Sequence, residues 1–81
     1  MKHDAKRVTP LPDYQLQVEL AYGRVGVFDV RPFFDHPGMA ALRDAAYFGR
    51  AGVLYGAVTW PDGEDIAPET LDAEMKFHAA A

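Results

Sequence analysis

The stretch from Tyr14 to Val30 reads YQLQVELAYGRVGVFDV, and it decides the fold class of this chain. Apolar and polar residues alternate in its first part, which places on one face Tyr14, Leu16, Val18, Leu20 and Tyr22. A period of two is typical of an antiparallel strand with one buried face. Gly23-Arg24 interrupts the pattern and an apolar run resumes at Val25, so the stretch predicts a β-hairpin.

Two weaker signals lie on either side of this hairpin. Val8 and its neighbours predict a third strand, closed off by Pro10 and Pro12, because proline cannot donate to a β-ladder. Residues 39–50 are rich in alanine and predict one helix or two short helical turns. Asp44 is expected to cap the second of these turns by accepting backbone N–H groups.

The last third of the chain returns to strand character from Val53 to Trp60. Pro61-Asp62-Gly63 predicts a turn, Ile66 a short return strand, and Pro68 the first position of a final helix. We therefore expect a single α+β domain over residues 1–81. Its architecture is a twisted antiparallel sheet of four to five short strands, with one or two short helices on one face.

The residue types that are missing exclude several kinds of chemistry. The chain has no cysteine and no serine, so it has neither a disulfide nor the nucleophile of a serine or cysteine hydrolase. The glycine pairs at Gly23-Arg24-Val25-Gly26 and Gly49-Arg50-Ala51-Gly52 lack the spacing and the lysine of a phosphate-binding loop. We expect no catalytic residue, no cofactor and no resident metal.

The charge pattern bears on partners and location. The net charge is −4 with dispersed acidic residues, which argues against direct nucleic-acid binding. The one basic cluster, Lys2, Lys6 and Arg7, is interpreted as a solvated terminus. No segment is apolar enough for a secretion signal or a membrane span, so a cytoplasmic protein without membrane association is expected.

Several motifs together resemble one known family. They are the closing segment from Trp60 to Leu71, the segments 23–32 and 42–48, and the opening residues Val8, Pro10, Leu11, Asp13, Tyr14, Leu16 and Val18. In this order they are similar to a bacterial family catalogued as domain of unknown function 2442. The resemblance implies an α+β domain without an established activity. Some members resemble partners of small toxin-like proteins and some carry an appended DNA-binding domain; this chain ends at Ala81, so any regulatory role is expected to act through another chain.

Two groups of side chains are candidate metal ligands. Asp62, Glu64 and Asp65 offer the oxygen ligands that Ca²⁺ and Mg²⁺ prefer, but their spacing fits no calcium loop, and turn formation explains them as well. Met1-Lys2-His3 has the arrangement that chelates Cu²⁺ through backbone nitrogens. His78 is explained by its place near a helix C-terminus.

Aromatic residues point instead to a partner. So small a domain cannot bury all its large rings, which predicts an exposed apolar patch for a homodimer or another protein. The residues expected on this partner surface are Phe33, Trp60, Asp62 and Phe77, although a core position is the commoner place for a residue such as Trp60.

Two hypotheses of function follow. The preferred one is a non-enzymatic protein-interaction or regulatory module. A small toxin-like protein is one candidate for its partner. The alternative is a small-molecule or metal-dependent enzyme that uses Asp35, His36, Asp62 and Asp65. An enzyme should gather His36 and at least two of these carboxylates in one pocket, whereas an interaction module should expose an apolar patch.

Overall fold

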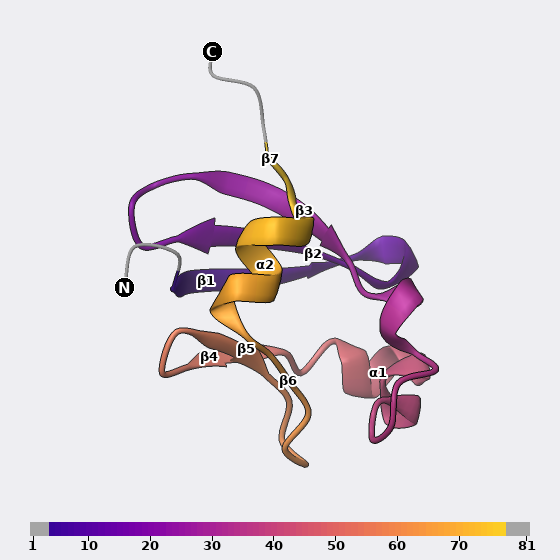
Figure 1. Cartoon of the computed structure of the whole chain (residues 1–81). Coiled ribbons are helices and arrows are strands. Elements are labelled where there is room, and N and C mark those ends of the chain that lie inside the picture. Colours follow the sequence, from indigo (N-terminus) through magenta and orange to yellow (C-terminus); the bar gives the residue numbers. More distant parts are fainter. Residues whose placement is uncertain (1–3, 78–81) are drawn as a thin grey trace.

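The computed structural model describes residues 4–77, which form two antiparallel β-sheets stacked with the core between them (Figure 1). The first sheet has the strand order β1-β2-β3-β7, with bounds Ala5–Leu11, Gln15–Leu20, Val25–Asp29 and Lys76–Phe77. The second has the order β4-β5-β6, with bounds Gly52–Leu54, Ala57–Thr59 and Asp65–Ile66. The expected α+β class and four-stranded antiparallel sheet are confirmed, and the structure adds the second sheet.

The hairpin predicted from the opening stretch is formed by β2 and β3, with Leu16 opposite Phe28 and Val18 opposite Gly26. The core-facing residues of the two strands, which are buried, are Leu16, Val18, Leu20, Gly26 and Phe28. Their neighbours on the opposite face of the sheet are exposed or half-buried, as the alternation predicts. Tyr22 is an exception, because it lies in the turn and is exposed.

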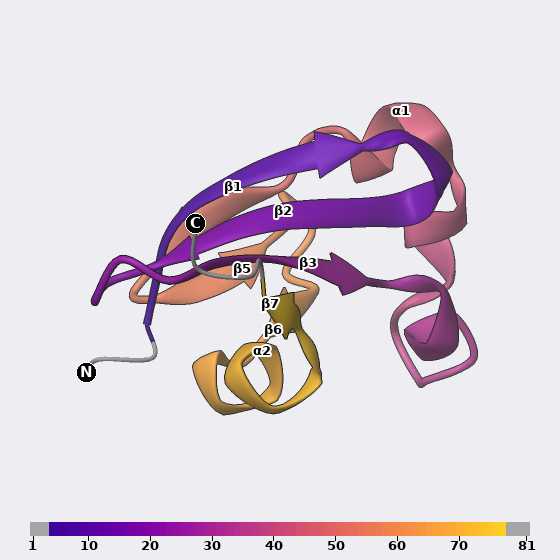
Figure 2. The same ribbon diagram turned by 90° about the horizontal axis from the view of Figure 1, so that it is seen from above.

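The predicted third strand is β1, which pairs antiparallel with β2. It runs through Pro10 to Leu11 rather than ending at the prolines. Pro10 is tolerated because β1 is an edge strand of the first sheet, where a missing N–H need not break a ladder. In Figure 2 no described helix or strand lies over the outer face of β1, β2 and β3, and α2 (Pro68–Glu74) lies beyond β3 on the side away from β1.

Gly26 allows the last strand to join this sheet. A Cβ atom at this position would lie 2.8 Å from the Lys76 carbonyl oxygen and 2.9 Å from the Met75 methyl carbon. Only a residue without a side chain fits there, and β7 therefore pairs with β3 through Gly26 and Phe77.

The prediction of one strand from Val53 to Trp60 is wrong. The chain reverses at Tyr55-Gly56, so the segment forms the hairpin β4–β5, in which Val53 lies opposite Val58. The φ angles of Tyr55 and Gly56 are 51° and 79°, as a type I′ turn requires. The expected turn at Pro61-Asp62-Gly63 and the return strand at Ile66 are present, the latter as β6.

The helical segments are short. Residues 39–50 form two helical turns, a 3₁₀ turn at Ala40–Arg43 and the helix α1 at Ala45–Phe48. Asp44 caps α1 as predicted, since its carboxylate accepts the N–H groups of Ala46 and Tyr47. Further 3₁₀ turns are Pro12–Tyr14 and Arg31–Phe33, and α2 begins at Pro68.

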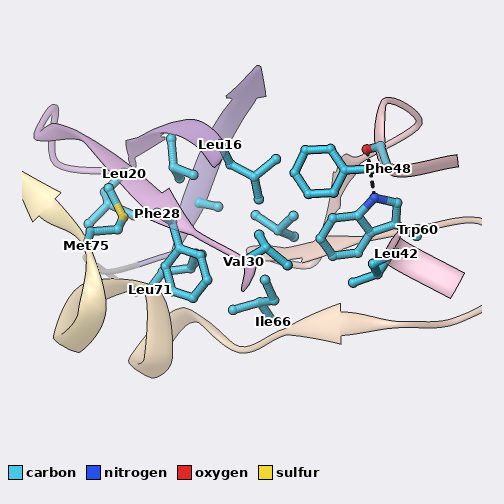
Figure 3. Close-up of a cluster of buried hydrophobic side chains, with 13 residues drawn as sticks. Leu16, Leu20, Phe28, Val30, Leu42, Phe48, Trp60, Ile66, Leu71 and Met75 are labelled. Carbon is cyan, nitrogen blue, oxygen red and sulfur yellow. Dashed lines mark hydrogen bonds between the residues drawn. The ribbon is translucent and has the colours of Figure 1, made fainter. Parts of the chain in front are cut away.

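The core joins both sheets and the helices (Figure 3). The second sheet and the loop between β5 and β6 contribute Val58, Trp60 and Ile66, while α2 and the residue after it contribute Leu71 and Met75. Trp60 donates its indole N–H to the carbonyl of Phe48, 2.9 Å away, so its one polar atom is satisfied in the interior. Within residues 4–77, no helix has the length and apolar character needed to cross a membrane.

Candidate functional site: an exposed apolar hairpin

Among residues 4–77, three of the four large apolar side chains that are exposed lie together on the β4–β5 hairpin, and the fourth is Tyr22. Val53, Leu54 and Tyr55 are 36%, 55% and 94% exposed, and they follow one another along β4 and into its turn. We call these three residues the hairpin surface. Exposed apolar side chains are ordinary when scattered, but a contiguous group often marks a contact with another molecule.

The turn of this hairpin is built at a cost to stability. A type I′ turn needs positive φ at both central residues, and asparagine, aspartate or glycine is the usual choice at the first. Here that position holds Tyr55, whose left-handed conformation is unfavourable for a residue with a Cβ. Its side chain is almost fully exposed, so packing within the described chain does not compensate for this conformation.

The second turn residue fastens the hairpin to the first sheet. Ala5 donates its N–H to the carbonyl of Gly56, 2.8 Å away, and Asp4 accepts a hydrogen bond from the N–H of Ala21. A Cβ at position 56 would come within 2.5 Å of the Asp4 side chain, so glycine is required. The hairpin surface is therefore held on a fixed support.

A shallow hollow of about 390 Å³ adjoins the hairpin surface. Its lining includes Arg50, Val53, Leu54, Trp60 and Pro61. Arg50 is exposed and makes no ion pair with any residue from 4 to 77. The hollow thus combines apolar side chains with a cation that forms no ion pair within the described part of the chain.

The four residues expected on a partner surface do not form one patch. Trp60 is only 3% exposed, and Phe33 and Phe77 are half-buried. Asp62 is exposed on the turn that leads to β6. The Phe77 ring is covered by the Arg24 guanidinium, 3.5 Å from its centroid. Phe33 stacks on Phe28, with 5.3 Å between the ring centroids.

The acidic turn is held by a tyrosine. Tyr47 donates its hydroxyl hydrogen to Glu64 and accepts the N–H of Asp62 at 2.8 Å. Desolvation raises the pKa of Tyr47, and the hydrogen bond to Glu64 adds to this effect. Asp62, Glu64 and Asp65 line a pocket of about 320 Å³, yet no three acidic or histidine side chains within residues 4–77 converge as metal ligands would.

The residues of the copper hypothesis, Met1-Lys2-His3, lie outside the described residues, and so does His78.

The fold brings together only some of the four side chains that the enzyme hypothesis requires, which are Asp35, His36, Asp62 and Asp65. His36 and Asp65 line one pocket of about 330 Å³, which also contains Met39 and Thr70. Asp62 lines the neighbouring pocket instead. The carboxylate of Asp35 lines neither of these pockets and is paired with Arg43. His36 therefore shares its pocket with one of the three candidate carboxylates, fewer than the enzyme hypothesis requires.

A further polar pocket of about 230 Å³ lies beside β3 and β7. Asp29 and Arg31 form a two-pronged ion pair on its wall, with distances of 3.0 Å to Nε and 2.9 Å to Nη2. These hydrogen bonds from Arg31 lower the pKa of Asp29, with a smaller contribution from the charge of Lys76. The pair orders the end of β3 and engages Asp29, while Glu74 and Lys76 line the same pocket.

Comparison with known protein families shows to which family the chain belongs. A family model described as "Protein of unknown function (DUF2442)" matches residues 5–76. The chain belongs to this family. For this DUF2442 member, no curated protein and no solved structure gave a match.

Sequence reasoning missed the hairpin surface. Residues 53–60 of this DUF2442 member look like one apolar strand, because Tyr55-Gly56 is not among the favoured pairs for a two-residue turn. One signal was available: a glycine inside a strand pattern often marks an interruption, and Gly56 is such a residue.

Proposed function

We propose that this DUF2442 protein is a non-enzymatic protein-interaction module that uses the hairpin surface as its contact site. The observation that carries the proposal is Tyr55, a large and almost fully exposed ring in a strained turn position. Strained residues tend to persist where function requires them, and tyrosine is enriched at protein interfaces. Regulation of the partner is the biological role that we propose for such a module.

The rest of the molecule supports this choice over an enzyme. The pocket with His36 and Asp65 contains Thr70 as its only side-chain hydroxyl, and most of its remaining lining is apolar. An acid–base mechanism needs a nucleophile and its base within hydrogen-bond reach, with a third group to orient them. The structure gives no hydrogen bond between His36 and any side chain of residues 4–77, so this arrangement is not assembled.

Site-specific photo-cross-linking tests the proposal. A benzophenone amino acid replaces Tyr55 in the full chain, which is then irradiated inside the cells that normally make it. We expect one defined cross-linked protein, identified by mass spectrometry as either another protein or a second copy of this chain. The same probe at Gln17, whose side chain is exposed on the outer face of the first sheet, should capture nothing above background. Equal capture at both positions, or none at position 55, would contradict the proposed contact site.

A further inference from the structure

The guanidinium of Arg50 forms no ion pair, side-chain hydrogen bond or ring contact with any residue from 4 to 77. Every other arginine of the chain has such a partner, in the ion pairs Arg7–Glu19, Arg31–Asp29 and Arg43–Asp35 and in the contact of Arg24 with the Phe77 ring. The chain carries twelve acidic residues against eight basic ones, so carboxylates are not scarce. Arg50 is therefore available to a carboxylate of another molecule.

The backbone around Arg50 fixes the base of its side chain beside the hairpin surface. The Arg50 N–H donates to the Tyr47 carbonyl, 2.9 Å away, in the turn between α1 and β4. Trp60 donates to the carbonyl of Phe48 in the same turn. This bond ties the turn to the residue after β5, and both Arg50 and Trp60 line the hollow. The cation and the apolar side chains of the hollow thus belong to one supported surface.

Tyr14 shows how this fold compensates a tyrosine in a left-handed conformation. Its φ angle is 60°, and its ring packs edge-on against Phe34 and Phe48, with centroids 5.1 and 5.3 Å away. Its hydroxyl donates to the Arg43 carbonyl. Tyr55 has a φ angle of 51° but no ring contact with any residue from 4 to 77. The packing that is missing at Tyr55 is expected from apolar side chains of a partner.

We propose that the hairpin surface and the adjoining hollow bind a protein segment in which an aspartate or glutamate stands beside aromatic or aliphatic residues. This inference rests on the proposed function and names the chemistry of its partner. The apolar residues of the segment pack on Leu54 and Tyr55, and its carboxylate accepts hydrogen bonds from the Arg50 guanidinium.

The carboxylate is required because covering a cation has a cost. A partner that fills the hollow removes water from Arg50, and a guanidinium left without an acceptor weakens binding. Arg50 is the only charged residue in the lining of the hollow and the only one between positions 45 and 61. Phosphate groups and nucleic acids are recognised by clusters of cations, so a single arginine favours a carboxylate. The net charge of −4 disfavours a segment with many acidic residues.

A peptide selection tests the proposal. Random peptides displayed on phage are selected in parallel on the immobilised full chain and on Arg50→Glu. We expect the wild type to enrich peptides with Asp or Glu beside apolar residues, and the variant to enrich Lys or Arg in place of the acid. The most enriched wild-type peptide is then synthesised, together with a version in which the corresponding amide replaces its acidic residue.

Fluorescence anisotropy of these two peptides gives a double-mutant cycle. Arg50→Gln should weaken binding of the acidic peptide about tenfold, and the amide version should bind the wild type equally weakly, because each change removes the same charged pair. Both changes together should weaken binding hardly more than either alone. Tyr55→Ser should weaken binding of both peptides about tenfold or more, since its contact does not depend on charge.

The control is Arg7→Gln, the same change at an arginine that pairs with Glu19 on the first sheet, and this variant should bind the acidic peptide like the wild type. Amide NMR spectra confirm that each variant is folded. A selection that enriches no acidic residue, or additive effects in the cycle, would overturn the inference. Cross-links from position 55 would in that case still support the contact site, whereas their absence would contradict the proposed function itself.

Discussion

The indole N–H of Trp60 lies 2.9 Å from the carbonyl oxygen of Phe48, and the two rings pack with their centroids 5.9 Å apart. The bond joins the end of α1 to the residue that follows β5. It fixes the second sheet against the helical segment while both rings stay in the core (Figure 3). Trp60 therefore supports the fold beneath the hairpin surface rather than contributing much exposed area to it.

Replacing this tryptophan should destabilise the protein strongly. In Trp60→Phe the core loses volume and the Phe48 carbonyl loses its buried donor, so the free energy of unfolding should fall by about 2–4 kcal/mol. Urea denaturation followed by circular dichroism measures the change. The control Leu54→Ala, on the exposed hairpin, should change the free energy by no more than about 0.5 kcal/mol. Equal effects of the two substitutions would contradict the core role of Trp60.

Two glycines should respond in opposite ways to the same substitution. Gly26→Ala forces a Cβ against the Lys76 carbonyl and should cost about 1–3 kcal/mol of stability while loosening β7. Gly52→Ala places its Cβ in open space and should be neutral or slightly stabilising. Thermal unfolding compares the two variants, and hydrogen exchange of the Phe77 amide reports on β7. A stable Gly26→Ala with unchanged exchange would show that β7 does not need the close approach.

The turn residue should be replaceable with a gain in stability. Tyr55→Asn puts a residue that tolerates positive φ at the strained position, so the free energy of unfolding should rise by about 1 kcal/mol. The measurement uses dilute protein, in which self-association does not contribute. Tyr22→Asn is the comparison, since Tyr22 is not among the residues with positive φ and bonds to Asp72, and it should destabilise. A loss of stability in Tyr55→Asn would mean that the tyrosine serves the fold itself.

The ion pair beside β3 gives a prediction for pH. Arg31 lowers the pKa of Asp29 in the folded chain, so the pair stabilises the fold above the pKa of an unfolded aspartate, about 4. This contribution is lost as the pH falls through the lower, folded pKa. In Arg31→Gln the pKa of Asp29 should rise toward its ordinary value, as followed by NMR titration of its carboxyl carbon. The control Arg43→Gln, whose partner is Asp35, should leave Asp29 unchanged; a rise in both variants would refute a specific pair.

Those parts of the fold that depend on local pattern could be predicted from the sequence. The alternation from Leu16 to Leu20 identified β2 because one face of that strand is fully buried, and Asp44 identified the start of α1 through its capping chemistry. The division into two sheets could not be predicted in this way. It depends on the reversal at Tyr55-Gly56, which follows from tertiary support by Asp4 and Ala5 rather than from turn propensity.

The sequence predicted that an exposed apolar surface exists, but not which residues form it. The shortage of core volume correctly indicated that some apolar side chains are exposed, but rings such as Phe77 gained partial cover from cations, here Arg24. Val53 and Leu54, two of the apolar residues left exposed, lie on the edge strand β4, and a single sequence does not reveal which strand lies at an edge.

The hydrogen bond from Ala5 to Gly56 gives the hairpin a reporter far away in the sequence. A peptide hydrogen exchanges with solvent only when its bond opens, and this bond can open only if the turn separates from the start of β1. A partner that binds the hairpin should hold the turn in place and so slow deuterium uptake at the Ala5 amide. Ala5 itself lies outside the hairpin to which the partner binds. One amide near the start of the chain thus records whether the hairpin is occupied, without a label on the contact surface itself.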